Sequence, residues 1–400
     1  MGMYGAWKEC IAIMSQLAAA IDFGTSKIAV VVGRLDERGA LVVTGAGQEP
    51  YAGFRDDEWL DVDGLDNAIL NAKRTAERLS GRRIRDVYVA VPGDFVRVVF
   101  NEAEVALRRR DGLVTREDVE NLLESAANFA HPAGYLPLHR TPVAYLIDGQ
   151  AKTHPPVGER ARSGTATAYV SHVLALETFI EDVSRILSNL GIGVLGFIAG
   201  PVGVGYLIRT QEETRRTAIV LDVGHYSMDI MVAEGDGLVF HDNMPMGGGT
   251  ITKDIAVVRH ATLEDAERWK RQITLGLKRG EVLDERRGTA LDDLAEAQEI
   301  AEARVWEMTR KVVATLKTLG VTYDSSTGIY LTGGGFSLLK GAKDILGSAL
   351  GKLVKVYSHP SPFLNSPTYT ASAGVLYYAL KVLSDRLTLG SLIARIKDMF

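Results

Sequence analysis

Two aspartates in this sequence each end an apolar segment and precede a turn of small residues. Asp22 lies in AIDFGTSKIAVVVG, and Asp222 lies in TAIVLDVGHYSMDIMVAEG. When the two aspartates are aligned, Gly24 falls on Gly224, and Ser227 falls near the hydroxyls of the first segment. One such hairpin is a common structural device, but its return in the second half of the chain indicates two related lobes.

Turns of this kind suit phosphate chemistry. Their backbone N–H groups can donate to phosphate oxygens without side-chain bulk, and two facing aspartates can hold a hydrated Mg²⁺. The candidate phosphate- and magnesium-binding residues are Asp22, Gly24, Thr25, Ser26, Lys27, Asp222, Gly224 and Ser227, with Asp22 and Asp222 holding the metal through water. The Lys27 side chain either adds a cation to this site or is a solvated hairpin residue.

Two later segments suit the same cleft. In IYLTGGGFSLLKG a strand ends in Gly333, Gly334 and Gly335 before a helix, an arrangement that lets backbone lie flat against a base or ribose. In EDAERWKRQIT, the charged residues Glu267, Lys270 and Arg271 share one face of a predicted helix. Such a face is either part of the binding site or simply solvated.

The elements around these residues alternate between strand and helix. The pattern predicts strands at 19–24, 28–33 and 40–46, then a helix at 64–79. A second unit begins near Asp86, and Thr115 is the expected N-cap of its helix. A Gly- and Pro-rich loop at 149–165 precedes a strand at 166–175 and a helix at 176–190.

The composition is that of an ordinary globular protein with more than one core. The chain has 400 residues, of which 46% are hydrophobic, and its formal net charge of −5 argues against bulk nucleic-acid binding. The single Cys10 rules out an internal disulfide, and with no apolar run long enough to span a bilayer we expect a cytosolic protein. Residues 1–18 are expected to be a start-site extension, with Met14 a plausible alternative start.

With these motifs in this order, the chain resembles the FtsA family of the actin-like ATPase superfamily from about residue 17 to its end. AIDFGTSK and LDVGHYSMDI resemble the two phosphate loops of the family, LTGGGFSLLKG the adenosine motif, and ERWKR the adenine and ribose clamp. MPMGGGTITKDIA resembles the segment after the second loop and adds Gly247 and Gly248 to the base- and ribose-binding set. TREDVENLL and PVAYLIDGQAKTHPPVG resemble a small inserted subdomain.

The resemblance implies an α/β fold of two duplicated ribonuclease-H-like lobes with the inserted subdomain and a C-terminal amphipathic helix. It assigns lobe I to residues 14–85, 173–216 and 361–383, the insertion to 86–172, the lobe II core to 217–256 and 326–360, the outer part of lobe II to 257–325, and a tether and tail to 384–400.

The end of the chain, LGSLIARIKDMF, carries an apolar stripe at helical spacing. Its members are Leu389, Leu392, Ile393, Ile396, Met399 and Phe400. Such a helix either docks on its own protein or lies in a membrane interface, and the family resemblance implies membrane targeting. One helix binds weakly, so polymerisation that presents many tails would make binding strong through avidity.

The resemblance also implies ATP and Mg²⁺ as ligands, self-assembly, and attachment of the FtsZ ring to membrane lipids at the cytoplasmic face of the septum. Arg304, in IAEARVWE, is the candidate contact for the acidic C-terminal tail of FtsZ, and a structural salt bridge is the alternative for this residue. A PilM-like pilus-assembly scaffold and an enzyme of the sugar-kinase or chaperone branches are the competing functions.

Two departures from the family pattern bear on catalysis. His225 and Tyr226 occupy places where the second phosphate loop usually has glycines, so their side chains either crowd the phosphates or point away. The connection IAGPVGVGYLI has Ala199, Gly200 and Pro201 where hydrolytic relatives place an acid. We therefore expect slow ATP hydrolysis or binding alone.

Overall fold

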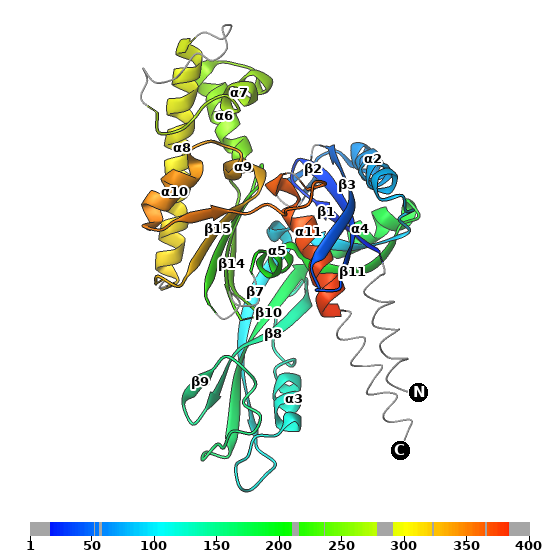
Figure 1. Ribbon diagram of the computed structural model, residues 1–400, viewed down its shortest axis with the longest axis vertical. Coiled ribbons are helices and arrows are strands. Elements are labelled where there is room, and N and C mark those ends of the chain that lie inside the picture. The colour runs from blue at the N-terminus through cyan, green and yellow to red at the C-terminus, as the bar shows by residue number, and fades with distance from the viewer. Residues whose placement is uncertain are drawn as a thin grey trace.

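The computed structural model describes residues 17–51, 53–55, 58–209, 216–235, 237–277, 291–321, 324–364 and 366–383. Its elements form three bodies, which Figure 1 shows with lobe I at the right, lobe II at the upper left and the inserted subdomain below. The predicted tail and its six apolar residues lie outside the described residues, as do Cys10 and Met14. Within the described part of the chain, no helix is long and apolar enough to cross a membrane.

Lobe I is built on a five-stranded sheet with the order β11-β6-β1-β2-β3. Its strands are β1 (Ala18–Phe23), β2 (Lys27–Leu35), β3 (Leu41–Pro50), β6 (Asp86–Val91) and β11 (Gly193–Ala199). β1 forms an antiparallel hairpin with β2 and pairs in parallel with β6. The predicted strands and hairpin are confirmed, because the apolar segments lie buried in this sheet.

Two helices of lobe I lie close to their predicted ranges of 64–79 and 176–190. Helix α2 (Val62–Ser80) starts at Asp61, whose side chain accepts a hydrogen bond from the Gly64 N–H, and it stops at Gly81 in the left-handed conformation. Helix α4 (Glu177–Asn189) follows the inserted subdomain and returns the chain to β11.

Lobe II repeats this plan with a sheet of order β14-β13-β12-β15-β16. Its strands are β12 (Ala218–Val223), β13 (Met228–Glu234), β14 (Gly237–Met244), β15 (Gly328–Thr332) and β16 (Val354–Val356). β12 pairs antiparallel with β13 and parallel with β15, as β1 does with β2 and β6. The duplication predicted from the two aspartate turns is therefore confirmed.

Helices of lobe II flank this sheet and form the upper end of the molecule in Figure 1. They are α6 (Gly248–Arg259), α7 (Leu263–Lys270), α8 (Leu291–Thr318), α9 (Gly334–Ser337) and α10 (Ala342–Leu350). Apolar side chains of α6, α8 and α10 share one buried cluster with β12, β13 and β15. That cluster is the core of lobe II.

The inserted subdomain is a four-stranded sheet of order β7-β10-β8-β9 with helix α3 (Arg116–Ser125). Its strands are β7 (Val96–Ala106), β8 (Tyr135–Ile147), β9 (Gln150–Lys152) and β10 (Thr165–Leu176). Thr115 caps α3 as predicted and forms a capping box with Asp118. The predicted loop at 149–165 contains the short strand β9, which pairs with β8.

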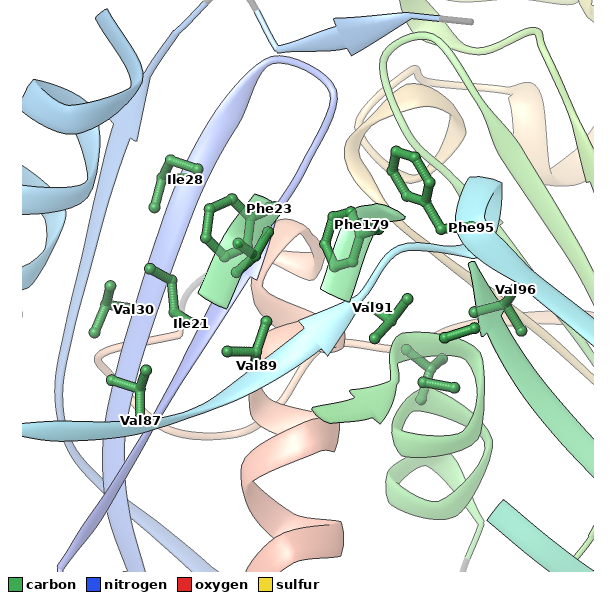
Figure 2. Packing of buried hydrophobic residues seen from close by; sticks show 14 of the residues in the cluster. Ile21, Phe23, Ile28, Val30, Val87, Val89, Val91, Phe95, Val96 and Phe179 are labelled. Carbon is green, nitrogen blue, oxygen red and sulfur yellow. The ribbon is translucent and has the colours of Figure 1, made fainter. Parts of the chain in front are cut away.

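The predicted start of the insertion at residue 86 differs from the structure. Strand β6, which begins at Asp86, belongs to the lobe I sheet, so the insertion begins after it. A 3₁₀ turn, η1 (Gly93–Phe95), leads from β6 into β7. Figure 2 shows Phe23, Phe179 and Phe95, the last residue of this turn, in a row. The ring centroids of Phe23 and Phe179 are 6.1 Å apart, and those of Phe179 and Phe95 are 4.5 Å apart. The aromatic core of lobe I thus extends to the first residues of the insertion.

Two helices cross at close range near the centre of the molecule. Helix α5 (Gly200–Ile208) follows β11, and α11 (Thr370–Tyr378) follows a 3₁₀ turn, η4 (Pro367–Tyr369), and continues as η5 (Ala379–Leu383). A Cβ atom on Gly203 would lie 2.7 Å from the Gly374 carbonyl carbon. Backbone therefore touches backbone here, and glycine is required on both helices.

Candidate functional site

A cavity of about 530 Å³ lies between the two lobes. This volume is in the range of small-molecule sites. Among the predicted site residues, those lining it are Asp22, Gly24, Thr25, Ser26, Lys27, Asp222, Gly224, Ser227, Gly248, Glu267, Lys270, Arg271, Gly333, Gly334 and Gly335. The fold thus brings together residues that come from distant parts of the chain.

The two predicted phosphate-binding turns have the same local geometry. The Gly24 N–H donates to the Lys27 carbonyl at 3.0 Å, and the Gly224 N–H donates to the Ser227 carbonyl at 2.9 Å. The turns also touch each other, because the Tyr226 N–H donates to the Thr25 hydroxyl oxygen at 3.2 Å. This hydrogen bond therefore joins the first turn, in lobe I, directly to the second turn, in lobe II.

The cavity floor concentrates negative charge. Burial raises the pKa of Asp22 to about 6, with Lys27 opposing the rise and Asp229 adding to it. Burial also raises the pKa of Asp222 to about 8, and the Asp229 and Asp22 carboxylates contribute. Like charges this close, out of water, favour a bound cation. Among the described residues no three His, Cys, Asp or Glu side chains converge to ligate a metal directly.

The Lys27 side chain is held inside the site. Its ammonium donates to the Thr368 carbonyl at 3.0 Å and to the Gln48 side chain at 3.2 Å, and it lies 5.3 Å from the Tyr369 ring centroid. Burial lowers its pKa to about 8, and the Asp22 carboxylate opposes that shift. Lys27 is therefore a partly buried, hydrogen-bonded cation beside the first turn rather than a solvated hairpin residue.

Gly333 and Gly335 of the adenosine-like motif lie against the second turn, whereas Gly334 faces the Thr368 side chain. Gly333 has a φ of +76°, and a Cβ atom there would lie 2.3 Å from an Asp222 carboxylate oxygen. A Cβ atom on Gly335 would lie 2.5 Å from the Gly224 carbonyl oxygen. Only glycine allows this backbone to approach the second turn so closely.

The charged helix face on α7 is partly turned inward. The Lys270 ammonium donates to the Gly248 carbonyl at 2.9 Å and to the Thr252 hydroxyl at 2.7 Å, and it pairs with the Glu267 carboxylate at 2.6 Å. The Arg271 side chain is 76% exposed and also reaches Glu267. Two of the three residues therefore hold the start of α6 in place, and all three line the cavity.

Gly247 does not line the cavity. It is the N-cap of α6, and a Cβ atom there would lie 2.5 Å from the Gly224 carbonyl oxygen. The next two N–H groups, of Gly248 and Gly249, donate to the carbonyls of Gly224 and His225 at 2.9 Å and 2.7 Å. This helix start supports the second turn instead of presenting free N–H donors.

His225 and Tyr226 stand where the second phosphate loop of the family usually has glycines, and their side chains lie in different surroundings. The His225 ring packs over Gly249, where a Cβ atom would lie 2.7 Å from Nε2, and it lines the edge of the cavity. Tyr226 is outside the cavity lining and stacks edge-on against His225 at 4.3 Å. Of the two side chains, only that of His225 borders the cavity.

Two acidic residues in the cavity are missing from the sequence analysis. Asp94 lies in η1, and Asp229 lies on β13 facing it. An acid directly after the strand VYVAVPG was a signal for Asp94, and Asp229 follows the second turn by two residues. Gly200 and Pro201 line the same cavity, as expected for the connection that lacks an acid.

Arg304 forms ion pairs within lobe II, as expected if it is a structural salt-bridge residue rather than a contact for FtsZ. Its guanidinium contacts the Asp254 carboxylate of α6 and the Glu307 carboxylate one turn along α8. Its side chain is 24% exposed. These pairs would have to open before Arg304 could bind another acidic group.

Two duplicated lobes that enclose a cavity lined by paired aspartate turns define the class of actin-like ATPase folds. The family model "Cell division protein FtsA" matches residues 219–374, and "SHS2 domain inserted in FTSA" matches residues 93–167. The FtsA of Bacillus subtilis is 26% identical over 92% of this chain and 84% of its own length, and that of Pseudomonas aeruginosa is 26% identical over 94% and 92%. The chain belongs to the FtsA family of actin-like cell division proteins.

Solved structures agree on the fold. A PilM–PilN type IV pilus biogenesis complex has a TM-score of 0.62 at 17% identity, covering 91% of this chain and 98% of that one. MreB5 of Spiroplasma citri bound to ADP has a TM-score of 0.52 at 11% identity, covering 92% of this chain and 100% of that one. These likenesses establish the actin-like architecture alone.

Proposed function

We propose that this chain is an ATP-binding cell division protein that polymerises at the inner face of the cytoplasmic membrane and anchors the FtsZ ring there. The single observation that carries the nucleotide part is the cavity in which the turns of both lobes meet. Membership of the FtsA family supports the division role. The apolar stripe at the end of the sequence supports the anchor.

Within this proposal, the two turns bind phosphates and the glycine motif faces the adenosine. Glu267 and Arg271 lie at the edge where a ribose and base would enter. Asp22 and Asp222 would hold Mg²⁺ through water, since their raised pKa values mark a site that a cation stabilises. When bound, Mg²⁺ offsets phosphate charge. The ADP of the MreB5 relative supports a nucleotide in this cavity.

Assembly links the nucleotide to the membrane. A single terminal helix with about six apolar side chains binds a bilayer weakly once the cost of ordering the helix is included. A filament presents many such helices at once, which raises binding by about 100-fold or more without a new contact. ATP-dependent polymerisation would therefore act as the membrane switch.

Vesicle co-sedimentation tests the anchor. The full chain is mixed with vesicles of phosphatidylglycerol and phosphatidylethanolamine, with and without Mg-ATP, beside a chain that ends at Ser384. We expect Mg-ATP to increase the bound fraction of the full chain and the truncation to remove it. Recruitment of FtsZ to the coated vesicles is then measured with and without Arg304→Ala.

A matched pair of substitutions separates the apolar stripe from the charge of the tail. Ile393→Asp places a carboxylate in the stripe, whereas Ala394→Asp adds the same charge beside it. The first should lose vesicle binding and the second should keep most of it. If the full chain ignores vesicles under both nucleotide conditions, the anchor is refuted and the scaffold function of PilM-like proteins gains support.

A further inference from the structure

Asp94 is a half-buried acid at the point where lobe I passes into the inserted subdomain. It lies in η1, directly after β6, and its side chain lines the interlobe cavity. The family-like connection at Gly200, where hydrolytic relatives place an acid, reaches the same cavity without one. Asp94 therefore supplies a carboxylate from a different element to the same space.

The carboxylate of Asp94 is held by donors from lobe II. The Ser227 hydroxyl, in the second turn, donates to Oδ2 at 3.1 Å, and the Asn243 amide donates to the same oxygen at 3.4 Å. Asn243 also donates to Asp229 at 2.9 Å, and His241 Nε2 contacts that carboxylate at 2.9 Å. This network fixes Asp94 next to the predicted phosphate-binding turn.

The backbone that carries Asp94 is rigid on both sides. Phe95 is buried and packs on Phe179 in the aromatic core. On the other side, a Cβ atom at Gly93 would lie 1.8 Å from an Asp229 carboxylate oxygen, so the backbone at Gly93 packs directly against the Asp229 side chain. A residue that orients a reactant must be held in this way, because small displacements cost much of the rate.

We propose that Asp94 is the base that orients the attacking water in ATP hydrolysis by this chain, in place of the acid absent near Gly200. The inference rests on the proposed ATP site. The water oxygen forms a bond to the γ-phosphorus, and the bond from that phosphorus to the bridging oxygen of ADP breaks. Asp94 accepts the water proton and then returns it to the released phosphate, so the base is regenerated.

The charge of Asp94 suits this role. Burial and the nearby Asp229 carboxylate together raise its pKa to about 6, while the Ser227 hydrogen bond and His241 oppose the rise. A base with a pKa just below neutral is ionised at pH 7 yet still accepts a proton readily. The hydrolysis rate should therefore fall about tenfold per pH unit below about pH 6.

Single-turnover hydrolysis of Mg-ATP with the full chain in excess tests the role, and binding of Mg-ATP is measured separately by calorimetry. Asp94→Asn keeps the size of the side chain and its ability to accept from Ser227. We expect it to lower the hydrolysis rate about 100-fold while Kd changes less than about twofold. Asp344→Asn, on the exposed face of α10, is the matched control and should match the wild type.

The outcomes separate this inference from the proposed function. If wild type and Asp94→Asn bind Mg-ATP and hydrolyse it at equal rates, Asp94 is not the base. If Asp229→Asn lowers the hydrolysis rate and Asp94→Asn leaves it unchanged, the role belongs to Asp229 and the proposal is overturned. A flat wild-type profile between pH 5 and 8 would also overturn it, and it requires no variant. Failure of the wild type to bind Mg-ATP would refute the nucleotide site itself.

Discussion

The crossing of α5 and α11 gives a stability prediction whose size follows from atomic contacts. A Cβ atom on Gly203 would lie 2.7 Å from both the Gly374 carbonyl carbon and the Val375 nitrogen. A Cβ atom on Gly374 would lie 2.5 Å from the Gly203 carbonyl carbon. Ordinary contacts begin near 3.4 Å, so either alanine forces the helices apart by roughly 1 Å.

Each substitution, Gly203→Ala or Gly374→Ala, should lower the free energy of unfolding by about 3 kcal/mol, the upper end for overpacking, because the neighbouring atoms are backbone. The double variant should cost less than the sum, since one displacement of the helices relieves both contacts. The measurement is urea unfolding of the wild type, both single variants and the double variant, analysed as a double-mutant cycle.

Gly205→Ala is the matched control on the same helix. A Cβ atom there meets only the Ala233 side chain at 3.9 Å, an ordinary contact, so alanine should be neutral or stabilising by about 0.5–1 kcal/mol. If Gly203→Ala unfolds at the same urea concentration as Gly205→Ala, the close approach is wrong. Full additivity of the two alanines would show that they do not share one contact.

Three further changes test the site and its surroundings. In metal-free protein, the pKa of Asp222 is about 8 in the folded state and 3.8 in the unfolded state. The protonated carboxyl group therefore contributes its full stability to the fold below pH 3.8, and this contribution is lost as the pH rises through about 8. Asp222→Asn should therefore be more stable than wild type at pH 8 by about 1–3 kcal/mol and lose this advantage at pH 4, measured by urea unfolding in chelator. Lys270→Met should cost about 2 kcal/mol, since Glu267 and the Gly248 carbonyl lose their buried cationic donor and keep only Thr252 and the exposed Arg271, and thermal unfolding checks this. Arg304→Ala should cost about 1 kcal/mol by removing one of the ion pairs that join α6 to α8, whereas Arg310→Ala, exposed on the same helix, should be neutral in the same assay.

Local signals account for the parts of the fold that the sequence predicts well. Short continuous apolar runs on both sides of the Asp22 and Asp222 turns specify two hairpins, because strands buried on both faces need apolar residues along their length. The Thr115 cap follows from a hydroxyl three residues before an acid. The presence of the phosphate-like turns therefore follows from short segments alone.

Contacts between distant segments account for what sequence reasoning missed. VYVAVPGDFVRVVF is β-rich throughout, so nothing local marks the change of sheet between β6 and β7. Asp94 enters the cavity only because lobe II places Ser227 and Asn243 against it. The inward turn of Lys270 likewise depends on the position of the Gly248 carbonyl, which tertiary packing sets.

The inserted subdomain is attached to lobe I at both of its ends. Val96 at the start of β7 and Val173 and Ala175 near the end of β10 belong to the buried core of lobe I, and the two strands pair along their length. The 11 residues of β7 extend about 35 Å from that base. If the paired strands move as one unit, a rotation of about 5° at the base displaces the far end of the subdomain by about 3 Å. Small changes of twist in the lobe I sheet are therefore magnified at the tip.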